Sequence, residues 1–221
     1  MNPFKITTAL LLLSTLTFGQ NSDFGNWLQY FGNQKINKNF NWHNEVQYRS
    51  YDALGDTNQW LLRTGIGYNL TENNNNILLG YAYINSKKYV PDTDDKFDIN
   101  EHRIFQQFIT KQNFDRVFIQ HRYRIEERFL PDDFQLRFRY LLGVNVPLNK
   151  KTMEKNAIYL SAYDEIFINA QDPLFDRNRI YGALGYVINK NIKIEAGFMN
   201  QTSENSNSNQ FQIAIFNTIP F

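Results

Sequence analysis

Charged side chains recur at every second position in the middle of this sequence. One segment carries Arg122, Arg124, Glu126 and Arg128 at its even positions. Successive side chains of a β-strand point to opposite faces, so these four residues would share one face of a strand. The same alternation in the other candidate strands gives a set that we call the charge ladder: Glu45, Arg49, Arg63, Glu101, Arg103, Arg122, Arg124, Glu126, Arg128, Arg137, Arg139, Glu165, Arg179 and Glu195.

The chemistry of this ladder depends on its enclosure. Guanidinium groups stay charged and pair bidentately with carboxylates, so Arg and Glu that face the bore of a barrel could pair across strands and fill it. The surplus of Arg over Glu could instead form a narrow pore or a binding site for a small anionic solute. On a lipid-facing surface each Arg near the midplane would cost about 2 to 4 kcal/mol, so an inward orientation is expected. The residues alone leave both roles open.

Alternating strands are the elements that would position the ladder. The clearest runs from Phe134 to Leu148, with apolar side chains opposite Gln135, Arg137 and Arg139. Short turns at 37–39, 112–115 and 189–191 would face the periplasm, and longer loops at 89–100, 169–176 and 203–208 the outside. The candidate strands are Asp23 to Ile36, Phe40 to Tyr51, Gln59 to Leu70, Ile77 to Lys88, Glu101 to Gln112, Arg116 to Phe129, Phe134 to Leu148, Asn156 to Asn169, Arg177 to Asn189, Ile192 to Thr202 and Asn209 to Phe221.

These segments predict an all-β fold consisting of a single antiparallel up-and-down transmembrane β-barrel. Single-chain bacterial outer-membrane barrels have an even number of strands with both termini on the periplasmic side. We therefore expect ten to twelve strands, with twelve favoured, although the pattern itself delivers eleven segments. Nothing rich in Pro, Gly or Ser divides the chain, so residues 20–221 are expected to form one barrel domain.

Both ends of the sequence suggest export. A lysine at position 5 precedes the apolar run Ile6 to Phe18, which is shorter than the roughly 20 residues of a transmembrane helix. Residues 1–19 therefore read as a signal peptide. The last strand alternates up to Phe221, a C-terminal aromatic residue typical of the signal read by the barrel-insertion machinery.

Composition excludes several classes of function. The chain has 19 Phe, 13 Tyr and 3 Trp but no Cys, which removes disulfides, thiolate metal sites and a lipid-modified N-terminal Cys. A net charge of +1 gives no basic excess for nucleic acid. We expect no cofactor and no metal site, because the acidic run from Asp92 to Asp98 lacks the spaced Gly and terminal Glu of a calcium loop.

Two alternatives remain open. A lipid hydrolase or acyltransferase would use a histidine among His43, His102 and His121, but no motif orders Ser, His and an acid here. A soluble lipocalin-like periplasmic barrel would turn the aromatic rows inward around a ligand and the ladder outward. We expect neither of these alternatives. We predict a monomer whose partners are outer-membrane lipid and the insertion machinery. If the ladder forms a pore or a binding site, a small anionic solute is a further partner.

Several segments in their order resemble the family catalogued as domain of unknown function 2490. They are 101–107, 121–129, 137–148, 164–169 and 176–181, beginning with Glu-His-Arg-Ile-Phe-Gln-Gln. The resemblance covers about 26–221 and implies an exported outer-membrane β-barrel of Bacteroidota type. It supplies no biochemical function and no catalytic residue.

Overall fold

The structure is a computed structural model that describes residues 24–71 and 74–220, and all its regular elements are strands. The expected signal peptide, residues 1–19, and the expected insertion signal, Phe221, lie outside the described residues. The strands are β1 (Phe24–Lys35), β2 (Phe40–Ser50), β3 (Thr57–Asn69), β4 (Asn75–Tyr89), β5 (Lys96–Phe114), β6 (Val117–Leu130), β7 (Asp133–Pro147), β8 (Ile158–Asn169), β9 (Phe175–Asn189), β10 (Ile192–Thr202) and β11 (Asn207–Asn217).

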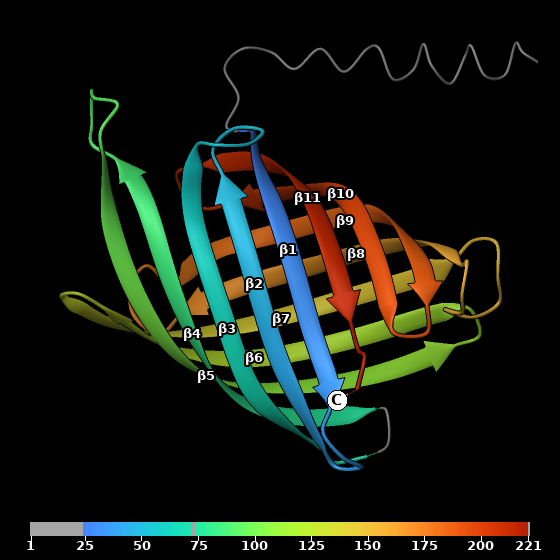
Figure 1. Ribbon diagram of the computed structural model, residues 1–221. Helices are drawn as coiled ribbons and strands as arrows, with labels where there is room; N and C mark the ends of the chain where they lie inside the picture. Colours follow the sequence, from blue (N-terminus) through green and yellow to red (C-terminus); the bar gives the residue numbers. More distant parts are fainter. Residues whose placement is uncertain (1–23, 72–73, 221) are drawn as a thin grey trace, which may run out of the picture.

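These strands form a closed barrel in which each one pairs antiparallel with its neighbours in the chain (Figure 1). The closing pair is different, because β1 and β11 run parallel, from Phe24 opposite Asn209 to Gly32 opposite Asn217. The all-β barrel is thus confirmed, with eleven strands among the described residues. The favoured count of twelve is wrong, because a parallel closing pair lets an odd number of strands close the barrel.

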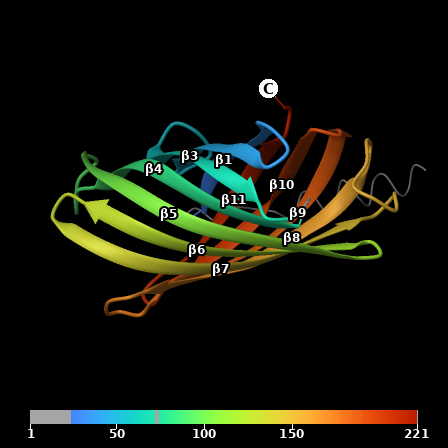
Figure 2. The same ribbon diagram turned by 90° about the horizontal axis from the view of Figure 1, so that it is seen from below.

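Because of the parallel closure, the first strand begins and the last strand ends at opposite rims of the barrel. β1 begins at one rim, which we call the N-terminal rim, and β11 ends at the other, the C-terminal rim (Figure 1). The expectation that both ends share one side therefore does not hold for the described strands. Figures 1 and 2 both show β6 and β7 on the wall opposite β1.

The connections divide between the rims as the sequence predicts. The turns after β1, β5 and β9 lie at the C-terminal rim, and the loops after β4, β8 and β10 lie at the N-terminal rim. Their lengths are less regular than expected. The connection 148–157 at the C-terminal rim is long, whereas 131–132 at the N-terminal rim is a tight turn.

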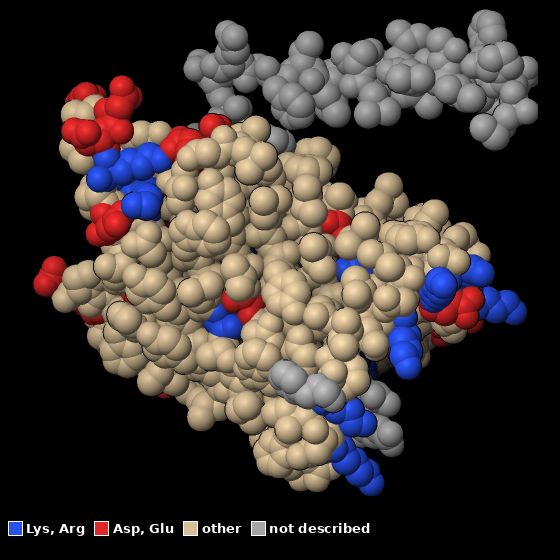
Figure 3. Space-filling model, in the orientation of Figure 1, with Lys and Arg blue, Asp and Glu red and all other residues tan. Residues whose placement is uncertain are grey.

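Alternation along each strand separates an apolar outer face from a polar interior. On β9, Ile180 and Leu184 are 60% and 57% exposed, while Arg179 and Tyr181, on either side of Ile180, are buried inside. Figure 3 shows one side of the molecule, where Lys, Arg, Asp and Glu gather mainly toward the rims. This orientation is the one expected from the sequence, and it is opposite to the lipocalin-like alternative, which requires the ladder outside.

The outer face has interruptions. Asp164 on β8 points outward and accepts a hydrogen bond from Asn178 Nδ2 at 2.6 Å. Glu127 on β6 accepts one from Gln106 Nε2 at 3.3 Å. Each carboxylate is thereby bonded to a neighbouring amide of the same face.

The final strand is shorter than its pattern predicts. Residues 211, 213 and 215 face outward as expected, but β11 ends at Asn217, and Asn217 Oδ1 accepts a hydrogen bond from the Ile219 backbone N–H. The described residues contain no helix long and apolar enough to cross a membrane.

Candidate functional site

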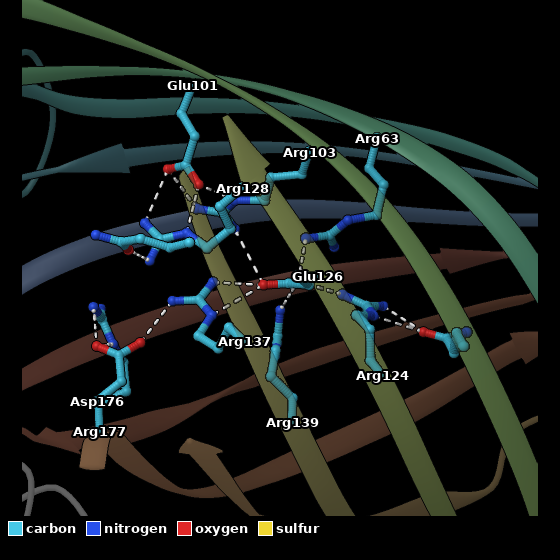
Figure 4. Close-up of polar contacts among 12 residues, drawn as sticks. Arg63, Glu101, Arg103, Arg124, Glu126, Arg128, Arg137, Arg139, Asp176 and Arg177 are labelled. Atoms are coloured by element: carbon cyan, nitrogen blue, oxygen red, sulfur yellow. Dashed lines mark hydrogen bonds and ion pairs between the residues drawn. The ribbon is translucent and has the colours of Figure 1, made fainter. Parts of the chain in front are cut away.

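The structure places every residue of the charge ladder inside the barrel. All of them except Glu126 line an interior cavity of about 580 Å³. Glu126 is 0% exposed because arginine side chains cover it (Figure 4). Residues near both rims border the cavity, with Lys88 and Arg177 toward the N-terminal rim and Asn33 and Asn217 toward the C-terminal rim.

Glu126 on β6 is the centre of the densest contacts, and Figure 4 shows arginines from several strands converging on it. Arg137 Nη2 donates to its Oε2 at 2.6 Å, and Arg139 Nη1 donates to its Oε1 at 2.6 Å. Three further guanidinium groups lie 3.6 to 4.0 Å from the same carboxylate. We call this set the Glu126 cluster: Glu126, Arg63, Arg103, Arg124, Arg137 and Arg139.

The register of the strands explains why arginines share carboxylates. Arg137 lies directly opposite Glu126 on the neighbouring strand, but Arg139 lies opposite Arg124. Like charges directly opposite one another are destabilising, so an arginine in such a pair gains by reaching past its neighbour to an acidic group. Arg139 does so with two carboxylates, because its Nη2 also donates to Glu165 Oε1 at 2.6 Å.

Three further carboxylates complete the ion-paired part of the ladder. Glu165 on β8 also receives Arg122 Nη2 at 2.7 Å. Glu101 on β5 receives Arg103 Nε and Arg128 Nε, both at 2.6 Å. On β2, Glu45 Oε2 accepts a hydrogen bond from Arg63 Nη1 at 2.5 Å, and Arg63 is the residue directly opposite on β3. Of the arginines on β6 and β7, Arg124 is bonded chiefly to an amide, donating through Nε to Gln107 Oε1 at 2.9 Å.

One member of this network was not predicted. Asp176 accepts from Arg137 Nη1 at 2.6 Å and from Arg177 Nη2 at 2.9 Å. By alternation Asp176 would point outward, but the register between β8 and β9 shifts between Phe167 and Ile168 and leaves Asp176 without a partner. Such a bulge redirects a side chain, and alternation alone cannot predict it. Lys111 and Lys193 also line the cavity, and alternation would have predicted both.

Aromatic rings inside the barrel are the second set that sequence reasoning missed. Phe167, which is 1% exposed, has the guanidinium carbons of Arg139 and Arg179 at 4.3 and 4.7 Å from its centroid. Phe105 has those of Arg124 and Arg63 at 4.8 and 5.3 Å. A cation over a ring face is attracted by the ring quadrupole, more strongly when water is excluded. These rings therefore add to the stabilisation of guanidinium groups inside the barrel, both those with a carboxylate partner and those without one.

Arg49 and Arg179 contact a ring and amides instead of carboxylates. Their guanidinium carbons lie 3.7 and 5.0 Å from the centroid of Trp27 on β1. Arg49 Nη2 donates to Gln47 Oε1 at 2.7 Å, and Arg179 Nε donates to Gln201 Oε1 at 2.8 Å. Neither guanidinium forms an ion pair within the part of the chain that the structure describes. We call this set the Trp27 cluster: Trp27, Gln47, Arg49, Arg179 and Gln201.

Glu195, the last member of the ladder, is bonded to hydroxyl groups. Tyr159 OH donates to its Oε1 at 2.9 Å and Tyr181 OH to its Oε2 at 3.4 Å. Glu195 as a whole is only 6% exposed. It therefore occupies a polar pocket without an arginine, unlike the other glutamates of the ladder.

The three histidines do not converge. His43 lies inside the barrel, with Nε2 3.4 Å from Glu45 Oε2. His121 lies on the outer face, where Nδ1 is 2.8 Å from Tyr140 OH, and His102 Nδ1 lies 2.5 Å from Tyr81 OH. Ser50 donates to Asp52 and to a backbone carbonyl. No Ser, His and acid come together among these residues as they do in a catalytic triad.

Comparison with known proteins bears on the family alone. The searches of curated proteins and of solved structures found no match. A family model described as "Protein of unknown function (DUF2490)" matches residues 24–212, from the first residue of β1 into β11. Because this match spans nearly the whole described barrel, the chain belongs to the DUF2490 family of proteins of unknown function.

Proposed function

We propose that this protein is a monomeric bacterial outer-membrane β-barrel whose arginine-rich interior takes up small anionic solutes, without catalysing a reaction. The observation that carries the proposal is the uneven charge inside the barrel. Ten arginines line the cavity, whereas the interior carboxylates are Glu45, Glu101, Glu126, Glu165, Asp176 and Glu195. A bore that is positive overall attracts anions and excludes cations.

The outer face supports the membrane part of the proposal. Large apolar side chains are exposed on strands all around the barrel, among them Leu79 at 61%, Ile180 at 60% and Leu184 at 57%. A monomeric soluble protein rarely exposes a continuous apolar surface of this extent. Aromatic residues near both rims, including Trp42 and Trp60, fit the girdles of membrane barrels.

Tryptophan fluorescence tests this orientation, because Trp60 and Trp27 lie on opposite faces of the barrel wall. Trp60 is 44% exposed on the outer face, whereas Trp27 is 7% exposed in the interior. Each would be kept as the single tryptophan, with the other two replaced by Phe, and the protein folded into vesicles whose acyl chains carry bromine. We expect strong quenching of Trp60 and little of Trp27. Equal quenching of the two, or release of the protein from membranes by carbonate without detergent, would overturn the membrane assignment.

A bilayer recording tests the interior. In a potassium chloride gradient we expect a small conductance with a reversal potential on the anion-selective side. Arg49→Gln with Arg179→Gln should lower that selectivity, because these two arginines lack carboxylate partners. The matched control is Lys38→Gln with Lys190→Gln, which removes the same charge at exposed turns of the C-terminal rim.

Collisional quenching provides an independent readout when conductance is too small to record. In the protein that keeps only Trp27, iodide should quench more strongly than caesium, because the interior favours anions.

The ion-paired Glu126 cluster supports a second candidate, a purely structural plug. Absence of conductance, of anion binding and of a difference between iodide and caesium would remove the uptake proposal and leave the plug.

A further inference from the structure

The Trp27 cluster differs from the rest of the interior in the charges that surround it. The charged groups around Arg49 are three arginines, Arg179, Arg103 and Arg177, and one carboxylate, Glu45. Most of its charged neighbours therefore have the same sign, although Glu165 lies opposite Arg179 on β8. Bringing guanidinium groups together out of bulk water without a carboxylate is unfavourable unless another anion compensates them.

Several hydrogen-bond donors of this cluster are unused. Gln47 accepts from Nε and Nη2 of Arg49, and Gln201 accepts from Nε of Arg179. No described residue accepts from Arg49 Nη1 or from either Nη of Arg179. These nitrogens are not sealed off, unlike Arg63 Nε and Arg122 Nε, which are buried without a partner. The unused donors can therefore reach the cavity that both arginines line.

Trp27 fixes the arrangement of the two arginines. It is 7% exposed and packs with Tyr181, Ala183 and Met199, so its ring is not free to move aside. A guanidinium that lies on a ring face keeps its N–H donors at its edge, where they can bind an oxyanion. The two amides hold the Nε edges, which leaves the Nη ends for a ligand.

We propose that Arg49 and Arg179, held by Trp27, bind the phosphoryl group of inorganic phosphate or of a small phosphate monoester near the N-terminal rim. A dianion would neutralise both guanidinium charges, and its oxygens accept from the unused Nη donors. This inference rests on the proposed uptake of anions, because the ligand must first enter the interior. It goes further by naming the residues of the site and the class of ligand.

The test uses the folded full-length protein with Trp42→Phe and Trp60→Phe, so that emission comes from Trp27 alone. Inorganic phosphate and glycerol 3-phosphate would be titrated in detergent micelles, with acetate and chloride as weaker anions, and binding checked by calorimetry. We expect saturable changes in emission with phosphate at concentrations at least tenfold below those needed for acetate. A response to glycerol 3-phosphate but not to inorganic phosphate would assign the site to organic monoesters, and the reverse would assign it to the free ion.

Variants locate the site. Arg49→Gln and Arg179→Gln should each weaken phosphate binding about ten- to a hundredfold, as expected for one charge-assisted contact. Arg49→Lys and Arg179→Lys keep the positive charge but lose the paired N–H donors of the guanidinium. They should weaken phosphate binding less than the glutamine variants do. The Lys38→Gln and Lys190→Gln variant should bind as the parent does, and heat-modifiable migration on gels shows that each variant is folded.

The outcomes separate the two proposals. If the double Arg49→Gln and Arg179→Gln protein binds phosphate as tightly as the parent, the site lies elsewhere, while an anion-selective interior still stands. If the parent protein binds phosphate no better than acetate, the assignment of the ligand is wrong. If Trp27 shows no preference for iodide over caesium and the barrel does not conduct, the uptake proposal fails, and this inference fails with it.

Discussion

The Glu126 cluster, from β3, β5, β6 and β7, and the Trp27 cluster, from β1, β2, β9 and β10, enclose arginines by different means. In the first, five guanidinium groups surround one carboxylate, and the closest contacts are 2.6 Å. In the second, a ring and two amides hold the arginines, and some donors stay unused. A carboxylate neutralises charge and occupies donors, whereas a ring stabilises charge and leaves the donors available. The first arrangement suits a rigid plug, and the second suits a ligand.

Among variants that test this contrast, Glu126→Gln should lower the free energy of unfolding the most. It keeps the shape of the side chain but removes the charge that five arginines share, and breaking such a buried network costs about 3 to 5 kcal/mol. Urea unfolding in vesicles, followed by tryptophan emission, measures the free energy. Glu195→Gln is the matched control and should cost much less, because its partners are hydroxyl groups. Equal losses for the two variants would mean that Glu126 is not the centre of the network.

Phe167→Leu should have an intermediate effect, because this ring contacts arginines of both clusters. The change keeps most of the apolar volume and removes the ring face, which predicts a loss of about 2 kcal/mol from cation–π contacts in a desolvated site. Phe138→Leu on the adjacent strand is the same substitution on the outer face, where Phe138 is 43% exposed. It should cost less than half as much. If Phe138→Leu is the more damaging in the same unfolding assay, the rings do not stabilise the interior charge.

Arg49→Gln should have the smallest effect on stability. Removing a charge most of whose charged neighbours are arginines relieves repulsion and offsets the lost contact with Trp27, so we expect a change within about 1 kcal/mol, of either sign. Arg137→Gln is the contrasting variant and should be clearly destabilising, because it removes one of the two closest cations of Glu126 and the closest cation of Asp176. A large loss for Arg49→Gln would show that Arg49 is a structural residue like Arg137.

Alternation predicted the two faces of the barrel well, because the side-chain period of a strand is a property of the backbone. It placed every member of the charge ladder inside, and it gave β10 with its bounds, Ile192–Thr202. It could not predict which carboxylate each arginine would reach. Arg63 approaches Glu126 from β3 only because the barrel closes and long side chains cross the interior.

Other features were missed for separate reasons. Asp176 turns inward at a shift of register, which no periodic pattern contains. Phe105 and Phe167 share a strand face with the ladder, but a pattern built on charged residues does not include them. The favoured count of twelve came from a rule about known barrels, while the pattern itself had already delimited eleven segments.

The parallel pairing of β1 with β11 has a consequence for assembly. Every other pairing joins strands that are adjacent in the chain, so those contacts can form by successive local steps. The remaining one unites residues near 24 with residues near 209 and requires almost the entire polypeptide to be in place. Folding should thus separate into rapid zippering of neighbouring hairpins and one late, entropically demanding joining event.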